Sequence, residues 1–306
     1  EGSAAISASR FEDGPVGAKT GGARLELSGC EFSGFARIGV ELKGGGHLLS
    51  RTAVRGSALG LGVEEGSATL RELTTDCSGT CVDVRCGAEL DWKGGGTAGG
   101  EIGVRVAGGA LRLRDVVCAG SAQGLRLESG TLQGDGLILK NHRDAALSML
   151  AEGSAAISGS RIEDSPVGAV TAGAALSLRE TQFLRCSSVC LSLERGVHVV
   201  DDCFFDPTCR DMMVGPGAEA RRDDRTRRFD AVWRLVLRTR SWPVLRGLYR
   251  AIYSAAVRRV GRWARGDARV RSALVGRGWV TGDWEPGVSD LDFTVGAEPR
   301  GGAGGA

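Results

Sequence analysis

The chain of 306 residues is 42% hydrophobic, which is enough apolar material for one large core or two modest ones. Its 49 glycines and its low aromatic content of 5% favour tight turns and small or aliphatic core residues over a bulky globular centre. No stretch is long and apolar enough for a membrane-spanning helix. Because the sequence starts at Glu1 inside a repeat, we expect it to be a piece of a longer protein.

The net charge of +2 conceals two oppositely charged parts of the chain. Residues 1–215 carry a net charge of −6 and all nine cysteines. Residues 216–306 carry 18 arginines, no lysine and 10 acidic residues, a net charge of +8, together with five of the six tryptophans. Such an abrupt change predicts a domain boundary near residue 215, followed by a charged linker over 216–228.

Internal repetition is the strongest feature of residues 1–215. Residues 1–18 recur almost unchanged at 152–169, an offset of 151 residues. A weaker pattern runs through the whole segment, in which a small residue is followed by an apolar residue, any residue and a second apolar residue. Its ten copies begin 21 or 22 residues apart, at Gly17, Gly39, Gly60, Cys81, Gly103, Gly124, Ala146, Gly168, Cys190 and Met212.

This period, combined with alternation of apolar residues, predicts a solenoid of about ten coils. Each copy of the pattern supplies a strand with two inward side chains, such as Val40 and Leu42. Two further strands are predicted in most coils. The second carries leucine pairs and the third a single large residue: Leu25 and Leu27, Leu111 and Leu113, Leu176 and Leu178; then Phe32, Val54, Val116 and Phe183. Three short strands per coil make a parallel β-helix with ladders of like residues.

On these repeats, residues 1–215 resemble the right-handed parallel β-helix repeat family of the pectate-lyase-like superfamily. The resemblance implies a mainly β fold that hosts polysaccharide-cleaving enzymes, adhesins and scaffolds alike. Glycoside hydrolysis needs two or three carboxylates at defined separations. The acidic candidates are Glu12, Asp13, Asp91, Asp115, Asp135, Glu163, Asp164, Asp201 and Asp202. The Asn-Thr-Asp, Gly-His-Gly and Arg-Ile-Lys set of polygalacturonases is absent, so solvated charges on a scaffold are favoured over a catalytic face.

Histidine and cysteine give no metal site by their spacing. The three histidines fall on different coils, and we expect surface or turn positions for them: His47, His142 and His198. Two cysteine pairs have the same four-residue spacing and the same place in their coils: Cys77 and Cys81, Cys186 and Cys190. Local disulfides there would indicate an oxidising compartment. The alternative is that these thiols serve as small apolar core residues.

Helical periodicity replaces β alternation after the linker. Apolar stripes at helical spacing run through residues 229–237 and 245–263, with arginines on the other faces. An α-rich segment is therefore predicted ahead of the last strands. Basic helices of this kind can bind nucleic acid or anionic lipid, but packing of the aromatic stripe on a domain core is favoured.

Residues 270–295 resemble the start of a nucleotidyltransferase domain with a polymerase-β-like fold. The matching residues are a turn at Arg277 and Gly278 and a carboxylate strand over 289–293, Ser-Asp-Leu-Asp-Phe. The resemblance implies that Asp290 and Asp292 are catalytic and bind Mg²⁺, and that Gly278 and Ser289 contact an NTP. Their spacing is suitable, because residues two apart on a strand point to the same side and can share one ion.

Two departures from that family limit the resemblance. The phosphate-contacting serine that the family has after the glycine is either replaced by Trp279 or deleted. A third carboxylate, which the family carries further on, has no residue here to supply it. An incomplete domain over 229–297, followed by a flexible tail over 298–306, is therefore expected to be inactive by itself.

Three functions remain open at this point. The first is a β-helix binding or scaffold module, with carbohydrate or protein on one face, joined to an incomplete domain that would transfer a nucleotidyl group from an NTP in the full-length protein. The second is a carbohydrate-active β-helix enzyme, and the third is an envelope adhesion module. Nucleotidyl transfer places the protein in the cytoplasm, whereas disulfides would place it in the cell envelope or outside the cell.

Overall fold

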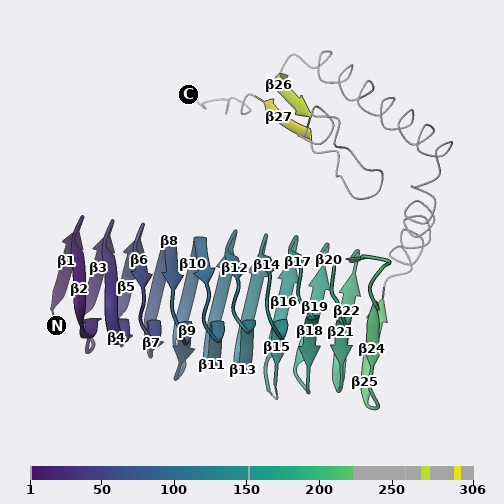
Figure 1. The fold of residues 1–306 in the computed structure, drawn as a ribbon, viewed down its shortest axis with the longest axis horizontal. Helices are drawn as coiled ribbons and strands as arrows, with labels where there is room; N and C mark the ends of the chain where they lie inside the picture. The colour runs from purple at the N-terminus through teal and green to yellow at the C-terminus, as the bar shows by residue number, and fades with distance from the viewer. Residues whose placement is uncertain (1, 151, 223–258, 260–269, 276–292, 298–306) are drawn as a thin grey trace, which may run out of the picture. The chain divides into compact units, whose positions relative to one another are not determined.

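The computed structural model describes residues 2–150, 152–222, 259, 270–275 and 293–297. The chain divides into two units, Glu1–Arg227 and Arg228–Ala306. In the first unit, 25 strands pair in parallel from turn to turn and form a β-solenoid (Figure 1). In the second unit, β26 (Val270–Val275) and β27 (Phe293–Ala297) form an antiparallel pair. The helices predicted over 229–263 lie outside the described residues, except for Arg259.

Each turn of the solenoid passes through three faces, named A, B and C. Face A contains β7 (Leu59–Glu64), β9 (Thr80–Arg85), β15 (Ala145–Met149), β18 (Val167–Thr171), β21 (Val189–Leu193) and β24 (Met212–Val214). Face B contains β1 (Ser3–Ser7), β3 (Arg24–Ser28), β5 (Gly46–Ser50), β16 (Ser154–Ser158), β19 (Ala175–Arg179), β22 (Gly196–Asp201) and β25 (Ala218–Arg222). Face C contains β6 (Ala53–Arg55), β12 (Val117–Ala119), β14 (Ile138–Lys140), β17 (Arg161–Glu163), β20 (Gln182–Leu184) and β23 (Phe204–Phe205).

Six longer strands bend around a corner and belong to two faces. From face C to face A run β2 (Arg10–Lys19) and β4 (Glu31–Lys43); from B to C run β8 (Ser67–Asp76) and β10 (Glu89–Ala98); from A to B run β11 (Ile102–Arg114) and β13 (Gln123–Asp135). The predicted three-strand coil is thus confirmed.

The strand register confirms the predicted ladders. In face A, one inward ladder runs without interruption through Ala18, Val40, Leu61, Val82, Val104, Leu125, Leu147, Ala169, Leu191 and Met212. Most of its members are fully buried, because the alternation of the sequence turns every second side chain into the core. The last predicted copy is wrong by one residue: Met212 pairs with Leu191, not with Cys190.

Face C has an inward ladder with a change of character along its length. Its members are Phe11, Phe32, Val54, Thr75, Thr97, Cys118, Leu139, Ile162, Phe183 and Phe205. Phenyl rings stack at both ends, with centroid distances of 4.7 Å for Phe11 and Phe32 and 5.1 Å for Phe183 and Phe205. The middle turns carry small side chains instead. Cys118 occupies the position predicted for Val116, which lies at the adjacent corner.

The corner between faces B and C is a column of left-handed residues. All ten turns have a positive φ there, at Ala8, Gly29, Arg51, Glu72, Gly94, Asp115, Gly136, Gly159, Glu180 and Asp202. Only four of the ten are glycine, although a positive φ is strained for other residues. The regular stacking of the turns therefore imposes this conformation on whatever residue stands at the corner.

The solenoid continues beyond the predicted boundary at residue 215. The last strand, β25, pairs in parallel with β22, so the stack includes the first part of the segment predicted as a charged linker. Within the described part of the chain, no helix is long and apolar enough to cross a membrane.

Candidate functional site

The site residues predicted for the second unit lie outside the described residues. Gly278, Ser289, Asp290 and Asp292 all fall within 276–292, which lies outside the described residues. The two strands on either side of this segment are described: β26 ends at Val275, before the predicted glycine turn, and β27 begins at Phe293, after the second aspartate.

Among the described residues, four of the nine acidic candidates form ion pairs with arginine: Glu12, Asp91, Glu163 and Asp164. Glu163 contacts Arg161 at 2.8 Å and Arg185 at 3.0 Å, and Arg185 also contacts Asp164 at 2.6 Å. The hydrogen bond from Arg185 holds the pKa of Asp164 below its usual range. A hydrogen bond from Arg105 likewise lowers the pKa of Glu128. A general acid needs the opposite, a raised pKa, so these carboxylates are suited to ion pairing and not to proton donation.

Several acidic candidates have a structural role at corners. Asp13, Asp115, Asp164 and Asp202 all adopt a positive φ, which Asp tolerates better than most residues because its short side chain can hydrogen-bond locally. Asp91 pairs with Arg114 at 3.0 Å across two turns of face B. The nine candidates therefore do not form a column of free carboxylates.

All three histidine side chains are buried, so the predicted surface positions were wrong. His142 does lie in a turn, between β14 and β15, whereas His47 and His198 lie on strands. His47 and His198 occupy the same inward ladder of face B, on turns far apart. In each, Nε2 contacts the backbone carbonyl three residues earlier: that of Gly44 for His47 and that of Arg195 for His198. His142 contacts Ser121 Oγ through Nδ1 at 3.0 Å. Burial lowers the pKa of His142 to about 4. All three are core histidines with hydrogen-bond partners.

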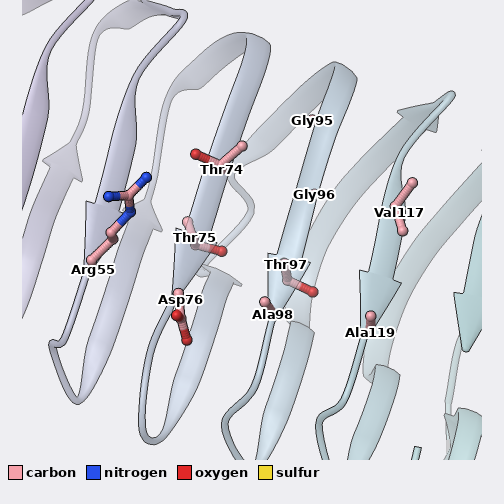
Figure 2. A pocket seen from close by; sticks show the side chains of 10 residues that line it. All are labelled: Arg55, Thr74, Thr75, Asp76, Gly95, Gly96, Thr97, Ala98, Val117 and Ala119. Atoms are coloured by element: carbon pink, nitrogen blue, oxygen red, sulfur yellow. The ribbon is translucent and has the colours of Figure 1, made fainter. Parts of the chain in front are cut away.

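A hollow of about 410 Å³ lies on the outer surface of face C (Figure 2). It spans four successive strands, β6, β8, β10 and β12. The hollow exists because the outward positions in its centre carry almost no side chain: Gly96, Ala98 and Ala119. Large or charged outward residues stand at the equivalent positions of turns further along the face, for example Arg161 and Glu163.

The walls of the hollow combine polar and apolar groups. Thr74 and Asp76 project outward from β8, and Val117 lies on the opposite side, on β12 (Figure 2). Arg55 stands at the rim, where its Nη1 is 3.1 Å from Glu31 Oε1. Among the described residues, no hydrogen bond or ion pair engages the exposed carboxylate of Asp76. A hydroxyl, a carboxylate, a guanidinium and an apolar wall therefore face one cavity of ligand size.

Two threonines below the floor distinguish this region from the rest of face C. The inward side chains of Thr75 and Thr97 are buried, and Thr97 pairs with Cys118 in the ladder of face C. Burial raises the pKa of Cys118 to about 11, so this thiol stays protonated.

The signal for the hollow was present in the sequence, as three small residues at outward positions of neighbouring coils, but it depends on an exact register.

Among the described residues, no group of three or more His, Cys, Asp or Glu side chains could hold a metal ion. No protein-family model, no curated protein and no solved structure matches the chain. The family resemblances stated from the sequence therefore rest on the residues themselves.

Proposed function

We propose that residues 1–222 form a right-handed β-helix that acts as a binding module without catalytic activity, and that the hollow on face C takes a short saccharide. The observation that carries this proposal is the composition of the hollow. Its volume is within the range of small-ligand pockets, and its polar groups converge from neighbouring turns.

Sugars present hydroxyls around an apolar ring face. The Asp76 carboxylate can accept two hydroxyl hydrogen bonds, the Thr74 hydroxyl can donate or accept one, and the Arg55 guanidinium can donate several. Val117, Ala98 and Ala119 offer a smooth apolar surface for the C–H groups of the ring. Because turns repeat every 4.8 Å or so along the axis, a chain of two or three sugars can run along the face.

Binding without cleavage is supported by the state of the carboxylates. Hydrolysis requires an acid with a raised pKa and a second carboxylate beside the same bond. Asp76 is the one carboxylate that lines the hollow, and the shifted carboxylates elsewhere on the solenoid, Glu128 and Asp164, have lowered pKa values.

Filling the hollow tests this proposal. Ala98→Leu places a side chain in the cavity from an exposed outward position, and Asp76→Ala removes its principal acceptor. Ala156→Leu is the matched control, because Ala156 is equally exposed but lies on face B. Binding of neutral and acidic oligosaccharides of two to six units is measured by glycan array and calorimetry. We expect at least tenfold weaker binding for the first two variants and no change for the control.

Two results would contradict the saccharide proposal. One is the absence of binding to any oligosaccharide of the panel, and the other is equal binding by wild type and Ala98→Leu. Release of shorter sugars from a bound oligosaccharide would refute the non-catalytic part and favour a carbohydrate-active enzyme.

For the second unit we propose nucleotidyl transfer in the full-length protein, with Asp290 and Asp292 as ligands of Mg²⁺ and Gly278 and Ser289 as contacts to an NTP. The strand β26 supports the proposal, because the motif requires a strand before the glycine turn, and β27 begins directly after Asp292. Mg²⁺ would neutralise the triphosphate charge. We expect Mg-ATP binding by the full-length protein to be lost in Asp290→Asn and kept in the control Asp283→Asn; binding that persists in Asp290→Asn removes the proposed metal role.

A further inference from the structure

Three thiols meet at one corner of the last two turns. Cys186 lies between β20 and β21, and Cys209 lies at the same corner of the next turn, between β23 and β24. The Cys190 N–H donates to the Arg210 carbonyl at 2.8 Å, which brings Cys209 beside the start of β21. Phe183 pairs with Phe205 just before this corner, so the segments that contain Cys186 and Cys209 run side by side. Cys186 and Cys190 are buried, whereas Cys209 is partly exposed.

The spacing of the turns allows a covalent bond between two of these thiols. Neighbouring strands of a sheet lie about 4.8 Å apart, and a disulfide needs its Cα atoms roughly 4.4–6.8 Å apart. Cys186 and Cys209 stand at equivalent corners of successive turns, three residues after Phe183 and four residues after its partner Phe205.

The chain supplies two internal comparisons. Cys77 and Cys81 form a buried thiol pair at the same corner, five turns earlier, but no third thiol joins them among the described residues. Cys86 is exposed, and its Sγ lies 3.8 Å from Glu64 Oε1, with no thiol contact in the described part of the chain. One comparison therefore lacks the accessible thiol and the other lacks a partner.

We propose that Cys209 is a modification site for low-molecular-weight disulfides and that Cys186 resolves the adduct to form a Cys186–Cys209 disulfide. The Cys209 thiolate attacks one sulfur of the reagent, forms a mixed disulfide and releases one thiolate. The Cys186 thiolate then attacks the Cys209 sulfur and releases the second. Two protein thiols lose two electrons and two protons, and the reagent is reduced to two thiols.

The surroundings of the two sulfurs assign their order. Cys209 reacts first because it alone of the three is accessible. Cys186 resolves the adduct because it stands at the equivalent corner of the neighbouring turn. Burial raises the pKa of the Cys209 thiol, so the first step should become faster at alkaline pH, whereas Cys190 lowers the pKa of Cys186. The product would tie the segment before β24 to the corner before β21, and so fasten the last turn of the solenoid.

Glutathione disulfide is the probe, because tryptic cleavage separates the thiols cleanly. Residues 186–195 contain Cys186 and Cys190, 196–210 contain Cys203 and Cys209, 72–85 contain Cys77 and Cys81, and 86–93 contain Cys86. The folded protein is incubated with the probe at pH 8, quenched with iodoacetamide, digested and analysed by mass spectrometry. We expect a cross-link between peptides 186–195 and 196–210, a stable glutathione adduct on Cys86, and unchanged thiols in 72–85.

Two variants separate the steps. Cys186→Ser should leave glutathione on Cys209, and Cys209→Ser should slow oxidation of peptide 186–195 at least tenfold, to the rate of peptide 72–85. The proposal is overturned if wild type retains glutathione on Cys209, if fragment spectra place the cross-link on Cys203, or if peptide 186–195 oxidises equally fast in Cys209→Ser.

Discussion

Asp83 and Arg85 lie two residues apart on β9 and form an ion pair of 2.6 Å, although the Asp83 side chain is only 2% exposed. Arg105, on the next turn, approaches the same carboxylate oxygen at 3.7 Å. Both arginines remain partly exposed, so each can be solvated without its partner. The carboxylate cannot, because it is covered by its neighbours. Loss of the arginine should therefore destabilise the folded protein more than loss of Asp83.

Removal of the cation should cost more than removal of the acid. In Arg85→Met the buried carboxylate keeps only the longer contact to Arg105, and we expect about 2 kcal/mol of destabilisation. In Asp83→Asn the arginines turn to water, and the cost should be below about 1 kcal/mol. Urea unfolding of both variants measures the difference. Equal or reversed costs would show that Asp83 is hydrated in the native state.

Gly124→Ala should destabilise the solenoid by about 1–3 kcal/mol, because a Cβ at this position would lie 2.5 Å from the Ala146 carbonyl oxygen and 2.6 Å from His142 Nε2. Gly62→Ala is the control. Its Cβ would meet only the end of the Leu59 side chain at 3.3 Å. Thermal unfolding should show a lower Tm for the first variant alone, and similar values for both would argue against a rigid ladder here.

Replacement of arginine by glycine should affect stability differently at the left-handed corner between faces B and C and within a strand. Arg51 has a φ of 48°, so Arg51→Gly removes backbone strain and should leave stability unchanged or raise it by about 0.5 kcal/mol. Arg71 lies within β8, where Arg71→Gly should cost about 1 kcal/mol through the entropy of the unfolded chain. Denaturant unfolding of the two variants checks the signs.

The buried His142 should make stability fall in acid. Its pKa is about 4 in the folded protein and near 6.5 in the unfolded chain, so protonation favours unfolding as the pH falls from about 6.5 to about 4. The loss attributable to His142 should reach about 2–3 kcal/mol at the low end. His142→Gln should show a shallower decline over this interval and the same slope as wild type between pH 7 and 8, as measured by urea unfolding at each pH.

The coil and its ladders could be predicted from the sequence because each inward position repeats every 21 or 22 residues. Val40, Leu61 and Val82 need only alternation and period to be placed in one ladder. The histidines were misplaced because polarity was taken as a sign of exposure. His198 alternates with Val200 as a core residue does, but its partner, the Arg195 carbonyl, is visible only in the folded corner.

The sites could be predicted less well, since they depend on side chains that adjoin across turns. The hollow requires Gly96 and Ala119 to lie on neighbouring strands at outward positions. An error of one residue in the predicted register would turn these positions inward. The thiol cluster could not be predicted because the register near it is shifted by one residue: Met212 pairs with Leu191 and not with Cys190. In this register the Cys190 N–H reaches the Arg210 carbonyl, next to Cys209.

The parallel pairing of one turn with the next has a consequence for how the chain folds. Every strand pairs with residues about one coil away in sequence, so an isolated turn has no partner for its backbone N–H and C=O groups. Folding must therefore nucleate in several adjacent turns and propagate along the axis. Among the described strands, β25 pairs on one side only, with β22, so its turn should open more readily than a turn in the middle of the stack.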